Sequence, residues 1–378
     1  MASPRVRMPV RWVLGALLVG MALVASWASA REGGGGTPEP LPALPPGACP
    51  EALPVLRLEG DAYARGFQHG QALREAIRQR GEHALRTWAS AGPSRPGLPL
   101  LPAAQAALPP DLWEEVQGIA DGAGVSLETV LLLNLWQSDG PGADGLLLAF
   151  VEVASDEPYL GWAGEGPCQD AVLLVHRTPE GDAYALLARA GQVGGVLGVN
   201  SAGLAGAVQE APALDLRTWG VPAGALLALG LAHATTADQA VDEVARARRA
   251  GGGAILWAES AGGALALVEF TAHRYAVKAP QKALLWQGFR DPWILELAPP
   301  LPEEERARER DGWLEANQGW MGQEKAWAWL VREAQGPGGL AALLDVASAR
   351  LWVAFGRGEG DLAGPGPVAL EEFLPETR

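Results

Sequence analysis

The sequence predicts an α+β fold in which two antiparallel sheets stack face to face between layers of helices, a four-layer αββα sandwich. Two observations predict it. Helical patterns come first and return after the middle of the chain, and short apolar strands fill the segments between them. The central strands follow one another with turns and no helices between them, which favours antiparallel pairing over a parallel sheet.

The N-terminus has the pattern of an export signal. Arg5, Arg7 and Arg11 precede an apolar stretch from Trp12 to Trp27, and the small residues at 28–30 suit a signal peptidase. We therefore expect residues 1–30 to be a signal peptide and the protein to be secreted or periplasmic. An uncleaved N-terminal membrane anchor is the alternative, because the apolar stretch approaches the ~20 residues that span a bilayer.

Residues 31–54 are rich in Gly and Pro and predict a flexible linker, and residues 55–378 are expected to form a single domain. The net charge of −15 argues against nucleic acid as a partner, and no membrane contact is expected beyond the signal segment. Cys49 and Cys168 are the two cysteines, and in an oxidising compartment they form either a disulfide or two inert thiols. No metal-ligand spacing is present, and no cofactor is expected.

The first part of the chain predicts a short strand at Arg57–Gly60 and a helix over Asp61–Ala89, whose Gly66 and Gly70 suit the close approach of another backbone. A proline-rich loop over Gly92–Pro110 follows, and Asp111 is a fair N-cap for the next helix. The helical pattern continues to Leu135.

The remaining elements are predicted from apolar runs and turn signals. The first series of strands is Leu146–Val153, Tyr159–Trp162, Ala171–His176, Tyr184–Ala190, Gly195–Asn200 and Gly203–Gln209. Helices follow at Pro222–His233 and Ala237–Ala250, and strands at Ala254–Glu259, Ala264–Thr271 and Arg274–Lys278. The last elements are helices Glu303–Ala316 and Gln323–Ala334 and strands Ala341–Ser348 and Leu351–Phe355.

Several segments, taken in order, resemble the acyl-coenzyme A:6-aminopenicillanic acid acyltransferase family of cysteine N-terminal-nucleophile hydrolases. The matching segments are GDAYARGFQHG (60–70), GIADGAG (118–124), AGQVG (190–194), GVNSAGL (198–204), GVP (220–222), ERAR (305–308) and LWVAFG (351–356). Each motif is weak alone, but their shared order covers about 300 residues. The resemblance implies the αββα fold, self-cleavage before a cysteine, and action on amide or thioester bonds of small acylated molecules.

This chain departs from the family where the chemistry takes place. The position of the nucleophile is matched by Ala143, and no Cys, Ser or Thr occurs from Asp139 through Ala154. The family's polar residues elsewhere are matched by Ala163, Glu165, Gln209 and Gln287. The sequence therefore predicts a retained scaffold whose nucleophilic chemistry has been lost.

Three residues could still supply chemistry. Cys168 lies in a loop one strand further along and is either a nucleophile or, as we favour, a disulfide or inert thiol. Glu165 could bind a cationic group or activate a water, or it is a solvated loop residue. Arg306 either supports the pocket, as the resemblance implies, or belongs to a salt-bridged helix face.

We therefore expect an exported protein that binds a small acylated or amino-acid-like ligand without turning it over. The alternative is an active amide or thioester hydrolase or acyltransferase that uses Cys168 or a water activated by Glu165. The ligand-contacting residues expected from the resemblance are Gln209, Gln287 and Arg306. The sequence sets no oligomeric state.

Overall fold

A computed structural model describes residues 49–50, 52–90, 101–135, 146–164, 168–211, 213–215, 217, 219–278, 284–286, 304–317, 319–334, 338–356, 362–363 and 367–374. The predicted signal peptide lies outside the described residues, as does most of the predicted linker. None of the helices in the described ranges is long and apolar enough to cross a membrane.

The first helical layer precedes most of the strands. It contains α2 (Ala62–Ala72), α3 (Arg74–Ser90), α4 (Leu101–Ala107), α5 (Pro110–Ala123) and α6 (Leu127–Leu135). The single helix expected over Asp61–Ala89 is two helices that are interrupted at Leu73, and α4 falls inside the expected loop. Asp111 lies in the first turn of α5 and is not its N-cap, because Pro109 and Pro110 begin that helix.

Eight strands make the first sheet. Their order across the sheet is β1 (Val55–Glu59), β4 (Ala171–Arg177), β5 (Ala183–Arg189), β6 (Leu197–Asn200), β7 (Leu204–Ala211), β8 (Gly252–Glu259), β9 (Leu265–Phe270) and β10 (Tyr275–Lys278). From β4 onward the neighbours are antiparallel, as expected. The pairing of β1 with β4 is parallel, so the purely antiparallel expectation is wrong at this edge.

The second sheet combines strands from distant parts of the chain. Its order is β11 (Leu284–Trp286), β2 (Leu146–Val151), β3 (Pro158–Gly164), β12 (Leu340–Asp345), β13 (Arg350–Gly356) and β14 (Leu362–Ala363), and β15 (Val368–Ala369) pairs with β13. All of these pairings are antiparallel. The β2–β3 hairpin therefore receives its third strand from β12, far along the sequence.

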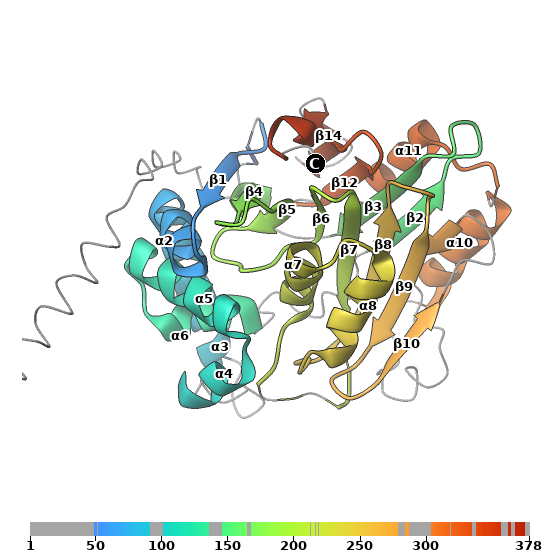
Figure 1. The fold of residues 1–378 in the computed structure, drawn as a ribbon. Helices are drawn as coiled ribbons and strands as arrows, with labels where there is room; N and C mark the ends of the chain where they lie inside the picture. Colours follow the sequence, from blue (N-terminus) through green and yellow to red (C-terminus); the bar gives the residue numbers. More distant parts are fainter. Residues whose placement is uncertain are drawn as a thin grey trace, which may run out of the picture. The chain divides into compact units, whose positions relative to one another are not determined.

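Figure 1 shows helices beside the two sheets, and three apolar cores lie between the four layers. The first core packs α2 to α6, together with α7 (Ala223–His233) and α8 (Ala237–Arg246), on the outer face of the first sheet. The second core lies between the two sheets, and the third packs α10 (Glu304–Ala316) and α11 (Gln323–Glu333) on the second sheet. The fold is thus the predicted αββα sandwich.

Helices α2 and α5 touch backbone to backbone. A Cβ atom added at Gly66 would lie 2.1 Å from the Glu115 carbonyl oxygen, and one at Gly70 would lie 2.3 Å from that of Ile119. The same holds for two glycines of α5. A Cβ atom added at Gly118 would lie 2.2 Å from the Tyr63 carbonyl oxygen, and one at Gly122 would lie 2.2 Å from that of Phe67. The close approach predicted from Gly66 and Gly70 is confirmed.

Candidate functional site

Most of the predicted site residues fall outside the described part of the chain. These are Ala143, in the segment before β2, Glu165, in the connection after β3, and Gln287, after β11. Arg306 lies in α10, but its side chain is not among those described. Cys168 and Gln209 are the two predicted site residues whose surroundings the structure defines.

Cys168 and Gln209 are brought to the same end of the sandwich. In the second sheet this end is where β2 begins and β3 ends, with Leu146 opposite Ala163. In the first sheet it is where β4 begins just after Cys168 and where β7 ends at Gln209 and beyond. Because Ala143 shortly precedes Leu146 in sequence, we call this the β2 end and treat it as the candidate site.

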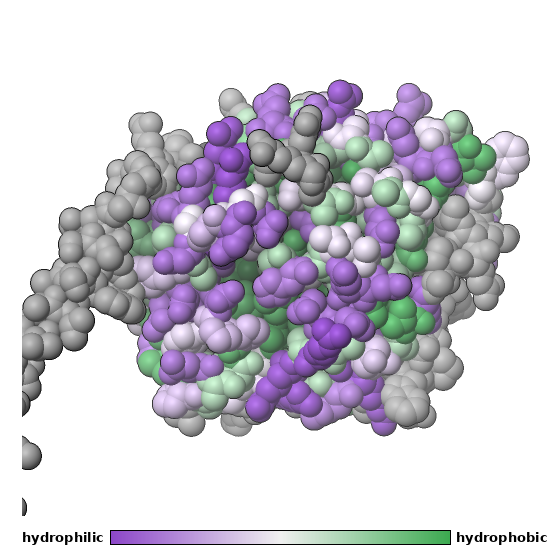
Figure 2. Space-filling model, in the orientation of Figure 1, coloured by the Kyte–Doolittle hydropathy of each residue, from purple (hydrophilic) through white to green (hydrophobic). Residues whose placement is uncertain are grey.

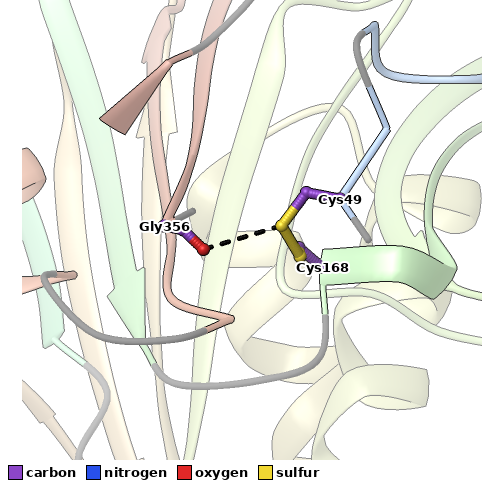
Figure 3. The surroundings of a disulfide bond; sticks show 3 residues. All are labelled: Cys49, Cys168 and Gly356. Carbon is purple, nitrogen blue, oxygen red and sulfur yellow. Dashed lines mark hydrogen bonds between the residues drawn. A yellow bond between two sulfur atoms is a disulfide. The ribbon is translucent and has the colours of Figure 1, made fainter. Parts of the chain in front are cut away.

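A disulfide joins Cys49, ahead of β1, to Cys168 at the β2 end (Figure 3). Cys168 is almost completely buried between the sheets. The Cys49 sulfur lies 3.6 Å from the carbonyl oxygen of Gly356, a contact without a shared proton because a disulfide sulfur carries no hydrogen. The predicted disulfide is confirmed, and in this oxidised state Cys168 has no thiolate to act as a nucleophile.

Gln209 lies on the inner face of the first sheet. Its neighbours on alternate positions of β7, Ala205 and Ala207, belong to the core between the sheets, whereas Leu204 and Val208 belong to the helix-covered core. The Gln209 side chain is buried, and its Nε2 donates to the Glu210 carbonyl oxygen at 3.3 Å. A side-chain amide carries both donors and an acceptor, and a contact of Gln209 with a ligand stays a prediction.

Trp162 adds a hydrogen-bond donor to the same end. It lies on β3 opposite Leu147, with its ring in the core between the sheets. The indole Nε1 is buried, and no acceptor within the described ranges is in hydrogen-bonding distance. A buried donor of this kind is costly to leave unused, so a carbonyl oxygen presented here would be favoured.

Glu269 and Lys278 form a buried ion pair that the sequence did not reveal. Glu269 lies on the inner face of β9. It pairs with Ala254 of β8, which pairs in turn with Gln209 of β7, so Glu269 and Gln209 are at the same level of the sheet. Its carboxylate is fully buried, and the Lys278 Nζ from β10 lies 2.9 Å from Oε1. The signal was present as a carboxylate in the apolar strand LALVEF, but its partner comes from the next strand and could not be paired from spacing alone.

Glu210 faces the opposite side of β7, towards the start of α7. The backbone N–H of Gly224, in the first turn of α7, hydrogen bonds to its carboxylate. Although part of the side chain remains exposed, dense packing around the carboxylate desolvates it and raises its pKa from 4.5 to about 7. Burial therefore shifts this carboxyl towards its protonated form relative to an exposed glutamate.

The family-like motif AGQVG forms a loop that other elements hold in place. His69 Nε2 accepts from the Gly191 N–H at 2.9 Å, which makes Nδ1 the protonated nitrogen. The amide of Asn134 donates to the Gly191 carbonyl at 2.8 Å and accepts from the Val193 N–H at 2.9 Å. The hydrogen bonds from His69 and Asn134 fix this loop, so the AGQVG motif has a structural explanation.

A buried polar cluster lies between α2, α5 and the outer face of the first sheet. It contains Arg65, His69, Glu115, His176 and Tyr184. Burial raises the pKa of Glu115 to about 7, although the nearby Arg65 guanidinium opposes this, and burial lowers the pKa of His69 to about 3.

His176 lies beside Glu115 in this cluster and stacks on the Tyr184 ring with the centroids 4.5 Å apart. Its Nδ1 lies 3.8 Å from Glu115 Oε1. Burial lowers the pKa of His176 well below its ordinary value, so the imidazole is neutral at pH 7 and this contact is not an ion pair.

No protein-family model matches the sequence, and no curated protein matches it. Several solved structures resemble it weakly. The C2A mutant of conjugated bile acid hydrolase from Clostridium perfringens is 9% identical over 60% of this chain and 93% of that one, with a TM-score of 0.40. Penicillin V acylase from Agrobacterium tumefaciens is 14% identical over 56% and 82%, with a TM-score of 0.39. The Caenorhabditis elegans N-acylethanolamine-hydrolyzing acid amidase ortholog is 12% identical over 53% and 93%, with a TM-score of 0.40. Likeness at this level assigns neither family nor activity.

Proposed function

We propose that this chain is an exported relative of the N-terminal-nucleophile amidohydrolases that binds a small acylated or amino-acid-like ligand at the β2 end without cleaving it. The observation that carries the proposal is the Cys49–Cys168 disulfide, because it engages both cysteines of the sequence. Acyl transfer by the route of that family needs a thiolate or an activated hydroxyl, and residues 139–154 offer neither. A disulfide also fits an extracellular location.

Mass spectrometry of the intact protein tests the loss of chemistry. We expect a single chain from which the signal peptide has been removed, lighter by two hydrogens under non-reducing conditions and inert to a thiol-alkylating reagent. The disulfide accounts for both mass and inertness. Two chains separated by a break near Ala143 or before Cys168, with a free thiol that takes the label, would contradict the proposal.

The surroundings of the β2 end support a ligand with an apolar acyl part and an amide. The inner faces of β2 and β3 are apolar here, and the polar groups near them in the described ranges include Trp162 Nε1, the Gln209 amide and the Glu269–Lys278 ion pair. N-acyl amino acids of increasing acyl length, titrated into the full-length protein and followed by NMR, provide the test. We expect W162F, which keeps an aromatic ring but removes the N–H, to weaken binding several-fold.

W320F is the matched control for that titration, because Trp320 is an exposed tryptophan far along the chain, 78% accessible. It should bind like the unmodified protein. If W162F and W320F bind the compounds equally well, the β2 end is not the ligand site. If the protein hydrolyses the same compounds with saturable kinetics, it is a catalyst and the proposal of binding without cleavage is wrong.

An active hydrolase is the second candidate, and the position of Cys168 is the observation that favours it. Reduction of the disulfide by a thiol would leave the Cys168 sulfur at the β2 end. Its thiolate could attack an acyl carbonyl carbon, the amine would leave with a proton, and water would then hydrolyse the thioester. Activity that requires a thiol reductant and is lost in C168A would establish this route, whereas activity lost only in E165Q would indicate a carboxylate-activated water.

A further inference from the structure

An open groove of about 640 Å³ lies beside the C-terminal end of α8 and the β9–β10 turn. Its lining contains Arg217, Arg246, Arg248, Arg249, His273 and Tyr275, the remainder being alanines, and we call it the arginine groove. None of the lining residues is acidic, although the whole chain carries a net charge of −15. Figure 2 shows strongly hydrophilic residues gathered over and just below α8.

Backbone hydrogen bonds join the two segments that carry Arg217 and Arg248. The Arg217 N–H donates to the Ala250 carbonyl at 2.8 Å, and Val221 exchanges hydrogen bonds with Arg248 and Ala250 at 2.7 and 3.0 Å. Gly220 permits this contact, because a Cβ there would lie 2.6 Å from the Arg248 carbonyl oxygen. The two segments that carry the arginines are therefore fixed relative to one another before any ligand arrives.

Arg249 is the structural member of the group. It is buried, and its guanidinium donates to the carbonyl oxygens of Thr271, Val244 and Ala245 at 2.9, 2.7 and 3.1 Å. Burial lowers its pKa, and the positive charge of Arg217 lowers it further. The arginines thus repel one another, and an anion in the groove would relieve that repulsion.

The neighbouring carboxylates do not line the groove, although the charge of Asp215 partly offsets the lowering of the Arg249 pKa. Asp215 Oδ2 accepts from the Thr271 hydroxyl at 2.7 Å and from the His273 N–H at 3.2 Å. Asp242 pairs with Arg246 along α8 at 2.9 Å. Arg217 and Arg248 make no ion pair with a carboxylate within the described ranges, so their charge is available to a ligand.

One hydrogen bond orients each of the guanidinium groups of Arg217 and Arg248. Arg217 Nη2 donates to His273 Nδ1 at 2.9 Å, and Arg248 Nε donates to the Trp219 carbonyl at 3.2 Å. Because a guanidinium carries several N–H groups in a rigid fork, both retain donors for an oxyanion. His273 accepts at Nδ1 and therefore carries its proton on Nε2, which supplies another donor.

We propose that the arginine groove binds a small phosphate- or sulfate-type dianion, either free or as the charged group of a larger molecule. Paired arginine forks match the tetrahedral oxygens of such groups, and Tyr275 offers an aromatic edge for an attached apolar part. The groove lies just beyond the ends of β7 and β9, at the same end of the first sheet as the candidate site, but the proposed function uses none of its lining residues and the inference does not depend on it.

Titration of the full-length protein at constant ionic strength tests it. Inorganic phosphate, sulfate and phenyl phosphate are each added while calorimetry or NMR follows binding. We expect saturable binding of one anion per chain, at least about tenfold weaker in R217Q and R248Q, with R248K in between because it keeps charge but loses the fork. Tighter binding of phenyl phosphate than of inorganic phosphate would indicate that the ligand is a phosphate ester. Equal binding of the two would indicate a free ion.

R86Q is the matched control, because Arg86 is an exposed arginine on α3 whose nearest acidic partner, Glu82, lies 3.9 Å away. It should bind like the unmodified protein. Arg248 is exposed, so R248Q should keep its unfolding temperature and report on binding alone. Equal weakening in R86Q, unsaturable binding, or no binding of any of the three anions would overturn the proposal.

Discussion

At the scale of single residues, the polar side chains of this protein serve two purposes. Some, such as Asn134 and Asn200, hold loops through several hydrogen bonds. Others, such as Glu115 and His176, are buried with hydrogen-bonding atoms that find no partner within the described ranges. The second kind makes stability depend on pH.

Glu115 provides a prediction about pH. Its folded pKa of about 7 exceeds the ordinary 4.5, so the folded state holds the proton more tightly and Glu115's share of stability is lost as pH rises from 4.5 to 7. E115Q removes this dependence. Between pH 5 and pH 8, the free energy of unfolding of E115Q should rise by up to about 3 kcal/mol relative to that of the unmodified protein. Urea unfolding at a series of pH values measures it.

In the same pH range His69 changes the stability in the opposite direction. Comparing E115Q with the unmodified protein cancels this contribution. His69 has a folded pKa near 3, below the ordinary 6.5, so its share of stability grows as pH rises through that range. Both proteins contain His69, so the difference between them isolates Glu115. A difference that stays constant with pH would show that Glu115 does not titrate in the folded protein near neutrality.

Asn200 provides a second prediction at this scale. Its amide donates to the carbonyl oxygens of Leu231 and Ala234 and accepts from the N–H groups of Ala202 and Leu204, which ties the β6–β7 turn to the end of α7. N200A leaves these buried groups unpaired and should cost about 2–4 kcal/mol in the free energy of unfolding. N317A should cost less than about 1 kcal/mol, because Asn317 is only half-buried. Equal losses would show that burial of these bonds is not what matters.

At the scale of elements, the contact between α2 and α5 is the most demanding in the helical layer. G118A would place a methyl group 2.2 Å from the Tyr63 carbonyl oxygen and 2.7 Å from the Phe67 nitrogen, both backbone atoms that cannot rotate away. We expect a loss of more than about 3 kcal/mol, measured by chemical unfolding.

Gly312 supplies the control, because it lies within α10 with open space around its Cα. G312A should be neutral or stabilise by up to about 1 kcal/mol, since alanine favours the helix. A loss in G312A as large as that in G118A would refute the packing argument.

Much of the element order could be predicted from the sequence, and the exceptions have physical reasons. Short apolar runs such as Ala171–Arg177 and the helix 223–233 are read from local pattern. The break at Leu73 and the parallel partner of β1 depend on packing, which leaves no local signal. At the candidate site, the role of Gln209 stays a prediction from the resemblance, whereas the Glu269–Lys278 pair required knowledge of which strands are neighbours.

At the scale of the whole molecule, the disulfide connects residues separated by 119 positions and so constrains the unfolded chain strongly. Adding a reductant during urea unfolding should lower stability by about 2–5 kcal/mol. The C49S/C168S double variant should start from the lower value and show no response to reductant. A response of the double variant would mean that reductant acts by another route.

The second sheet sets an order in which the protein can be completed as it emerges from the ribosome. β2 and β3 appear before the middle of the chain, but β12, which lies against β3, follows only at residue 340. Until then β3 presents an open strand edge that a neighbouring nascent chain could pair with. Slow elongation between residues 164 and 340 would lengthen this exposure, so the cell gains from a chaperone that shields the hairpin until β12 arrives.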